Sequence, residues 1–205
     1  MQKVRKLLCL LLCAAMLMSM SAVCFAANNK YSSWFKTNYD EINQLGLMPA
    51  SFNGLDLTKD ITRGEMCELA VYAFEKATGN DIDLSNESFT GFTDTNDEKI
   101  VKAHLYGIVN GYEDGTYKPT KAINRQEMAK VLYGYDKVGG KNAEGITEKL
   151  TYTDVDAIGE WAIESVTYCT AAGYLAGSNG AFNPTGTATR AMGAKVLMNM
   201  TKEAA

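Results

Sequence analysis

The stretch GYEDGTYKPTKAINRQE, residues 111–127, contains the signals for a turn, an extended segment and the start of a helix. Asp114-Gly115 is a strong turn dipeptide, because aspartate can hydrogen-bond nearby backbone and glycine accepts a positive φ. Asn124 is a good N-cap, since its side-chain oxygen can accept a hydrogen bond from a first-turn N–H group. Glu127, three residues later, completes a capping-box pattern. The stretch therefore predicts a structured loop that leads into a helix beginning at Arg125.

The same unit occurs three times in the chain. Arg125 has counterparts at Arg63 and Arg190, and the two intervals are 62 and 65 residues. A glycine that fits the left-handed position at a helix end precedes each arginine by 17 or 18 residues. These glycines are Gly46, Gly107 and Gly173. The regular spacing indicates internal repeats, with predicted bounds of 27–79, 89–140 and 150–204.

Each repeat is predicted to be a helix, a glycine-rich loop and a second helix. The second helix has one apolar stripe with helical spacing, which in the middle repeat consists of Met128, Val131, Leu132 and Tyr135. Thr62 and Glu65 form a capping box in the first repeat, whereas Thr189 in the third is followed by Met192 at the glutamate position. One helix pair buries little surface, so the three pairs are expected to pack on one another. The fold class is therefore mainly α.

Two tryptophans begin the upstream helices. Trp34 and Trp161 each precede the glycine of their repeat by 12 residues, and the middle repeat has no counterpart. We interpret both as packing residues in preference to platforms for sugar stacking.

The N-terminus has the features of a secretory signal peptide. Lys3, Arg5 and Lys6 precede an apolar run over 7–20, and residues 24–26 resemble a cleavage site. The prediction is a signal peptide at 1–26 and a secreted protein, in preference to a lipoprotein anchored at Cys24. Removal of the signal changes the formal net charge from −4 to −7. An acidic chain does not favour nucleic acid as a partner, and we expect no membrane association after cleavage.

Two cysteines, Cys67 and Cys169, follow the predicted signal peptide. A secreted pair could form a disulfide. Each, however, lies in a helical pattern where related segments carry alanine, so we interpret them as two buried thiols. No cysteine and histidine pattern indicates a zinc site.

In each repeat an arginine occupies the first position of the second helix. This placement needs an explanation, because the helix dipole disfavours a cation there. A guanidinium beside free N–H groups would form an anion site. The alternative is an ion pair with a nearby acid, either Asp94, Asp154 or a capping glutamate.

These motifs resemble the S-layer homology domain family. The middle repeat supplies GFTD, GIVNGYEDGTYKP and INRQE, the third supplies YTDV, NGAFNP and ATRAM, and the first supplies ITRGE. The resemblance implies a pseudo-threefold spindle in which three helix-loop-helix repeats surround a central three-helix bundle. It also implies non-covalent anchoring to a Gram-positive-type cell wall or surface layer, through a secondary wall polysaccharide that often carries a pyruvate ketal. Other surface-layer proteins are further candidate partners, and no cofactor or metal is implied.

The resemblance places the ligand in grooves between repeats. The predicted ligand residues are Arg63, Arg125, Arg190, Asp94, Asp154, Gly111 and Gly177. The helix caps that support them are Thr62, Glu65, Asn124, Glu127 and Thr189. Because Met192 departs from the pattern and the loop of the first repeat is unusual, we expect one or two competent grooves, with Arg125 foremost.

Three other classes of function are alternatives to this one. An enzyme would have to use His104 or loop carboxylate pairs such as Asp81 with Asp83 or Asp154 with Asp156, and no cleft is indicated around them. A calcium-binding loop is disfavoured because Lys118 and Lys121 occupy the region where EF-hand ligands belong. A secreted protein-interaction module of the same fold, without glycan binding, stays as the main alternative.

Overall fold

The computed structural model describes residues 30–89, 91–141, 146 and 149–203, so the predicted signal peptide lies outside the described residues. The described part is helical, with only isolated β-bridges, which confirms the mainly α prediction. The α-helices are α2 (Lys36–Gln44), α3 (Arg63–Thr78), α4 (Glu98–Leu105), α5 (Arg125–Val138), α6 (Ile163–Ala171) and α7 (Arg190–Glu203). Short 3-10 turns are η2 (Ser33–Phe35), η3 (Ala50–Phe52), η4 (Leu84–Asn86), η5 (Val155–Ala157) and η6 (Glu160–Ala162). None of the described helices is long and apolar enough to cross a membrane.

The three long helices begin at the predicted arginines. Both predicted capping boxes are confirmed, at Thr62 with Glu65 and at Asn124 with Glu127. In α7 only half of the box is present, since Thr189 Oγ1 accepts from the Met192 N–H at 3.3 Å. The predicted apolar stripes are buried, including Met66 and Leu69 of α3, Met128 and Leu132 of α5, and Leu197 and Met200 of α7.

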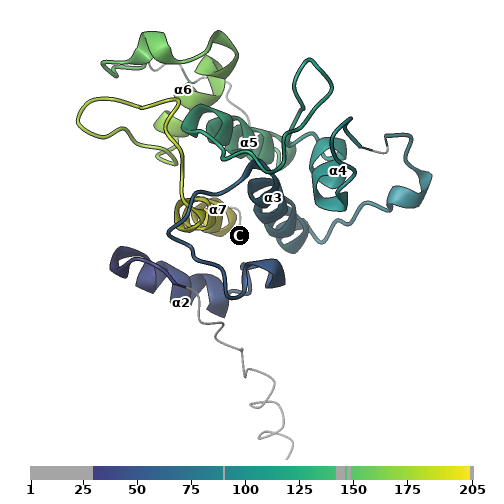
Figure 1. Ribbon diagram of the computed structural model, residues 1–205. Coiled ribbons are helices and arrows are strands. Elements are labelled where there is room, and N and C mark those ends of the chain that lie inside the picture. The colour runs from purple at the N-terminus through teal and green to yellow at the C-terminus, as the bar shows by residue number, and fades with distance from the viewer. Residues whose placement is uncertain (1–29, 90, 142–145, 147–148, 204–205) are drawn as a thin grey trace, which may run out of the picture.

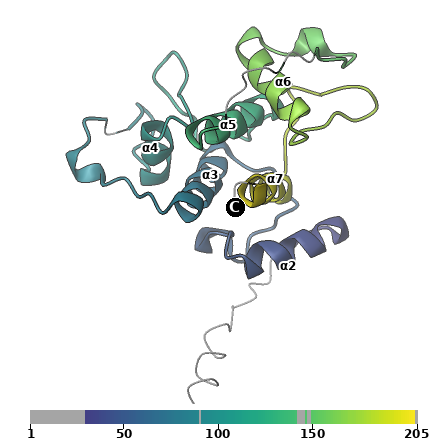
Figure 2. The ribbon, with the colours of Figure 1, turned by 180° about the vertical axis from the view of Figure 1, so that it is seen from behind.

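Helices α3, α5 and α7 lie together in the middle of the molecule, and α2, α4 and α6 lie around them (Figure 1). Helix α3 contacts both α5 and α7. Each outer helix packs on a long helix of another repeat: α4 on α3, α6 on α5, and α2 on α7 (Figure 2). The contact between α2 and α7 joins the first predicted repeat to the last.

The same backbone contact recurs where each long helix begins. The first N–H group of α3, at Arg63, donates to the Lys121 carbonyl at 2.9 Å, and the first N–H group of α5, at Arg125, donates to the Gly186 carbonyl at 2.9 Å. The Arg190 N–H donates to the Lys59 carbonyl at 2.9 Å in the same way. We call these places the Arg63, Arg125 and Arg190 junctions. Their likeness supports the predicted pseudo-threefold spindle, which stays a prediction for the whole molecule.

The tryptophan interpretation was wrong. Trp34 is 48% exposed and Trp161 is 51% exposed, so neither is a core residue. Each lies in a 3-10 turn just before its helix, and the neighbouring residue takes the core position instead: Phe35 and Ala162 are both fully buried. The two indole rings are left on the surface.

The predictions for the glycines and cysteines are confirmed. Gly46, Gly107 and Gly173 have φ values of 63°, 84° and 73°, as expected for left-handed helix ends. Cys67 and Cys169 are free and buried. Burial raises the pKa of the Cys67 thiol to about 12, and its sulfur lies 2.7 Å from the Tyr117 hydroxyl oxygen.

Candidate ligand-binding grooves

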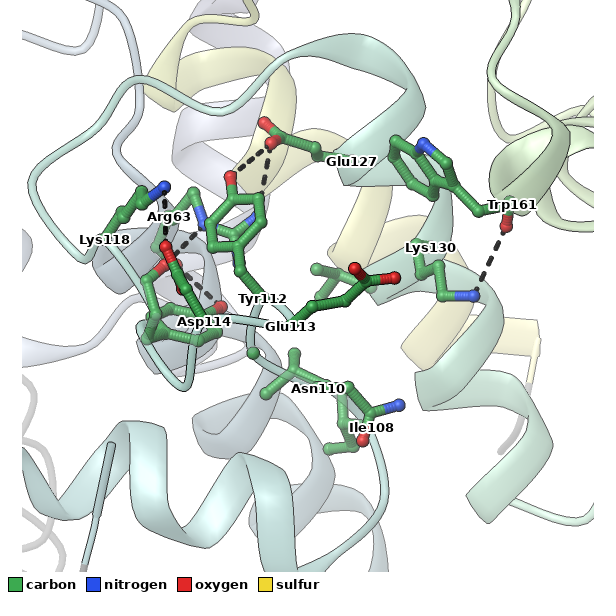
Figure 3. Close-up of a pocket in the computed structure, with 14 residues that line it drawn as sticks. Arg63, Ile108, Asn110, Tyr112, Glu113, Asp114, Lys118, Glu127, Lys130 and Trp161 are labelled. Atoms are coloured by element: carbon green, nitrogen blue, oxygen red, sulfur yellow. Dashed lines mark hydrogen bonds and ion pairs between the residues drawn. The ribbon is translucent and has the colours of Figure 1, made fainter. Parts of the chain in front are cut away.

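A groove of about 590 Å³ opens beside the Arg63 junction. It is formed by the loop before α5, by the outer side of α5 and by the turn that carries Trp161 (Figure 3). Its charged lining residues are Arg63, Lys118, Lys130, Glu113, Asp114 and Glu127. Tyr112, Tyr117 and Trp161 supply its aromatic surface. Concave sites with aromatic walls and a few polar groups are typical of small-molecule binding.

Several polar and aromatic groups contact the Arg63 guanidinium in this groove. Its Nε donates to the Tyr117 carbonyl at 2.8 Å, and its Nη1 lies 3.5 Å from Glu127 Oε1. The central guanidinium carbon also lies over the rings of Tyr112 and Tyr117, 4.6 and 4.5 Å from their centroids. Only 7% of Arg63 is exposed. The guanidinium therefore stacks on two aromatic rings and is already paired with a carboxylate.

Glu127 collects several donors at once. Its Oε1 accepts from the Tyr112 hydroxyl at 2.6 Å and from Lys121 Nζ at 2.9 Å, while Oε2 accepts from the Asn124 N–H at 3.0 Å. Burial alone would raise the pKa of Glu127. The hydrogen bonds from Asn124, Tyr112 and Lys121, together with the Arg63 charge, outweigh burial and leave the pKa below its ordinary value.

Trp161 lies across the groove from Tyr112 (Figure 3). Lys130 Nζ donates to the Trp161 carbonyl at 3.4 Å, which links α5 to this turn. The indole packs against Gly159, where an added Cβ would lie 2.6 Å from the indole nitrogen. Trp34 has a similar neighbour, since Lys195 Nζ of α7 lies 5.6 Å from its ring centroid. Lys130 and Lys195 each stand five residues after their arginine, a spacing from which this pairing could have been predicted.

Asp94 and Asp154, predicted as ligand residues, anchor the loops. The two carboxylate oxygens of Asp94 accept the Tyr117 and Lys118 N–H groups at 2.8 and 2.7 Å. Those of Asp154 accept the Phe182 and Asn183 N–H groups, both at 2.7 Å. The first of these backbone hydrogen bonds lowers the pKa of each aspartate most. Both carboxylates thus position the ring on which an arginine stacks, and ligand contact by them stays a prediction.

Gly111 and Gly177 are required by close packing. A Cβ at Gly111 would lie 2.5 Å from a Phe92 ring carbon, and one at Gly177 would lie 2.5 Å from a Tyr152 ring carbon. Each glycine lets its loop cross an aromatic ring. Their role at the ligand stays a prediction.

The other two arginines have different partners. Arg125 donates from Nε to the Phe182 carbonyl and from Nη2 to the Ala176 carbonyl, both at 2.8 Å, and its central carbon lies 4.7 Å from the Phe182 ring centroid. Arg190 instead forms a bidentate pair with Glu65, with its Nε 3.0 Å from both carboxylate oxygens. Burial lowers the pKa of Arg125, with Tyr152 and Asp154 opposing that effect.

One part of the anion-site prediction was wrong. The first-turn N–H groups of the long helices are not free, because they donate to carbonyls of the next loop or to the cap. The N–H groups of Gly64, Gln126 and Ala191 donate to the carbonyls of Pro119, Pro184 and Leu57 at 2.9, 3.1 and 3.0 Å. Any anion site at the junctions must therefore rely on the arginine side chains.

The residues considered for catalysis or calcium have structural partners. His104 lies 4.2 Å from the Phe89 ring centroid, and its Nδ1 is 3.2 Å from the Val109 carbonyl oxygen. Asp81 pairs with Lys102, and Asp83 caps η4 through the Ser85 N–H. Over the described residues, no group of three or more histidine, cysteine, aspartate or glutamate side chains is placed to hold a metal ion.

Comparison with known proteins identifies the class of this module. The family model for the S-layer homology domain matches residues 102–129 and 151–191, which include the Arg125 and Arg190 motifs. Over these two segments the chain matches the S-layer homology domain family.

Three curated relatives come from Acetivibrio thermocellus. "Cell surface glycoprotein 1" is 34% identical over 139 residues, which are 62% of this chain and 6% of that protein. "Cellulosome-anchoring protein" is 33% identical over 128 residues, which are 58% of this chain and 26% of that protein. "Exoglucanase XynX" is 25% identical over 114 residues, which are 51% of this chain and 10% of that enzyme. The chain therefore matches only a small part of each of these longer proteins.

Proposed function

We propose that the protein is a non-covalent cell-wall-anchoring module that binds an anionic secondary wall polysaccharide in the grooves at its junctions. The observation that carries this proposal is the groove at the Arg63 junction, in which a half-exposed indole faces a tyrosine across about 590 Å³. Aromatic faces are rigid apolar surfaces with polar edges, so they suit the alternating apolar and hydroxyl surface of a sugar ring. Lys118 and Lys130 on the rim can donate hydrogen bonds to hydroxyl groups.

The arginines account for recognition of charge. A guanidinium matches a carboxylate with two parallel hydrogen bonds, and this geometry adds both energy and selectivity. A pyruvate ketal on an amino sugar presents such a carboxylate. Because a wall polysaccharide repeats its sugars, contacts that are weak singly would combine into tight attachment. The names of two relatives, a cell surface glycoprotein and a cellulosome-anchoring protein, agree with a surface location.

Sedimentation with purified cell walls tests the proposal. The protein should co-sediment with untreated walls and should be released when the pyruvate is removed chemically. Arg125→Ala should weaken binding about tenfold or more, because a hydrogen bond to a charged group is worth roughly 1.5–3 kcal/mol. The triple variant at Arg63, Arg125 and Arg190 should abolish it. Lys99→Ala, which removes an exposed charge of α4 outside the groove, is the matched control.

Two results would overturn the proposal. Binding that survives both pyruvate removal and the triple substitution would exclude recognition of the anion and favour a protein-interaction module. Binding that is lost on chelation alone would favour calcium. Because Arg125 also contacts loop carbonyls, the melting temperature of each variant is measured alongside, and Arg125→Lys serves as a variant that keeps the charge but not the fork.

A further inference from the structure

Two of the three junctions share a pairing rule that was not evident from the repeats alone. At the Arg63 junction, the arginine pairs with Glu127, the capping glutamate at the third position of α5. At the Arg190 junction, the arginine pairs with Glu65, the capping glutamate at the third position of α3, with an Nη2 to Oε1 distance of 2.8 Å. Each of these two arginines is therefore paired with the capping glutamate of the next repeat, and the third repeat pairs with the first.

The Arg125 junction breaks this rule. The third position of α7, where the rule would place a partner carboxylate for Arg125, is occupied by Met192, which is 43% exposed. Within the described part of the chain, the Arg125 guanidinium donates to the carbonyls of Phe182 and Ala176. No carboxylate of the described residues lies within ion-pair distance of it. Asp154 favours the Arg125 charge by a Coulombic effect, without forming an ion pair at that distance, so Arg125 is the arginine at the three junctions that lacks the glutamate partner of the rule.

A second difference concerns the aromatic cover of the Arg125 guanidinium, which leaves it more accessible to a ligand. The Tyr112 N–H donates to the Thr116 carbonyl, and the Ser178 N–H donates to the Ala181 carbonyl, both at 2.8 Å, so Tyr112 and Ser178 hold the same place in their loops. The Tyr112 ring stacks on the Arg63 guanidinium. A serine cannot stack on Arg125 in this way. Among the described residues the Arg125 guanidinium stacks on the ring of Phe182, whereas that of Arg63 stacks on two rings.

The Arg63 groove, in contrast, is balanced in charge. Three cations line it, Arg63, Lys118 and Lys130, and three carboxylates accompany them, Glu113, Asp114 and Glu127. An anionic ligand would gain little net attraction there, and it would have to displace Glu127 from Arg63. The aromatic walls of this groove remain suited to an uncharged sugar.

From these differences we propose that Met192 is a specificity-determining residue. Because Met192 supplies no carboxylate, the Arg125 guanidinium can bind the carboxylate of the polysaccharide. The Arg125 junction then recognises the charged sugar, and the Arg63 groove binds uncharged sugar. The inference rests on the proposed function and assigns its charge recognition to one junction. Met192 adds an exposed apolar surface near which a small alkyl substituent of the ligand can lie. The carboxylate takes the place that a capping glutamate takes at the other two junctions.

The test is to restore the missing glutamate. Met192→Glu should rebuild the capping box at Thr189 and supply a carboxylate for Arg125, whereas Met192→Gln has the same shape without the charge. The probes are a synthetic amino sugar with a pyruvate ketal and its uncharged methyl ester, both titrated calorimetrically into the full protein. The wild type should bind one equivalent of the charged probe, and at least tenfold more tightly than the ester.

The two variants should differ in their affinity for the charged probe. Met192→Glu should bind the charged probe at least tenfold more weakly than the wild type, with little change for the ester, and its melting temperature should rise by roughly 2–4 °C. Met192→Gln should stay within about threefold of the wild type. Unchanged affinity in Met192→Glu, or an equal loss in Met192→Gln, would overturn the assignment to Met192 while wall binding persists. Equal binding of the charged probe and the ester by the wild type would instead refute charge recognition and the proposed function with it.

Discussion

The Glu127 side chain connects several parts of this molecule. It caps α5, accepts hydrogen bonds from Tyr112 and Lys121, and pairs with Arg63 of the preceding repeat. One carboxylate thus ties together a helix, a loop and a neighbouring repeat. Its pKa is lower in the folded protein than in the unfolded chain, so it contributes stability only while it is ionised.

This residue should make the protein sensitive to acid. Because the folded pKa is depressed, the contribution of Glu127 is fully present above its unfolded pKa of about 4.3 and is lost as the pH falls through the folded value. Glu127→Gln should be less stable than the wild type at pH 7, and the difference in free energy of unfolding should shrink below about pH 4. Urea unfolding at several pH values measures it. A difference that stays constant from pH 7 to pH 3 would contradict the role of ionised Glu127.

The partners of the arginines mark the limit of what could be predicted from the sequence. The capping boxes were predictable because the residues concerned stand three positions apart. A capping glutamate was one of the partners predicted for the arginines. That this glutamate belongs to another repeat could not be predicted, since the Arg190 to Glu65 pair joins residues 125 positions apart. The prediction that the tryptophans are core residues was wrong for another reason. Helical spacing could not decide whether Trp34 or Phe35 takes the core position.

At the scale of elements, α5 depends on a close approach that only glycine permits. An ideal Cβ on Gly134, in the interior of α5, would lie 2.1 Å from the carbonyl oxygen of Ile108 in the segment after α4. Gly193 in α7 is also crowded, but its nearest neighbour, at 2.9 Å, is the terminal methyl of Ile61. A side chain can rotate away from an added methyl group, whereas a backbone carbonyl held by its own segment cannot.

These two glycines give a matched pair of substitutions. Gly134→Ala should lower the free energy of unfolding by about 1–3 kcal/mol, the usual cost of overpacking, partly offset by the better helix propensity of alanine. That loss corresponds to roughly 2–4 °C in melting temperature per kcal/mol. Gly193→Ala should cost clearly less. Thermal unfolding followed by circular dichroism compares them, and an equal or smaller loss for Gly134→Ala would show that α5 and the Ile108 segment are not locked together.

At the scale of the whole molecule, the contacts form a closed circuit. Helix α3 contacts α5 and α7, and α2 of the first predicted repeat packs on α7 of the third. The backbone hydrogen bonds at the Arg190 junction close the circuit a second time, between Arg190 and Lys59. In an open array each repeat contacts only its neighbours, and its ends can unfold separately. A closed circuit has no such ends, so loss of one repeat exposes core surface of both others.

The two tryptophans allow this closure to be tested without truncating the protein. Trp161→Phe leaves Trp34, next to α7, as the only tryptophan, and Trp34→Phe leaves Trp161, next to α5. Urea unfolding followed by fluorescence in each variant should give the same midpoint as the helical signal from circular dichroism, because a two-state transition looks the same to every probe. If the Trp34 signal were lost at lower urea than the Trp161 signal, the first repeat would unfold on its own. The contact between α2 and α7 would then be too weak to close the circuit, and the grooves at the Arg63 and Arg125 junctions could persist without it.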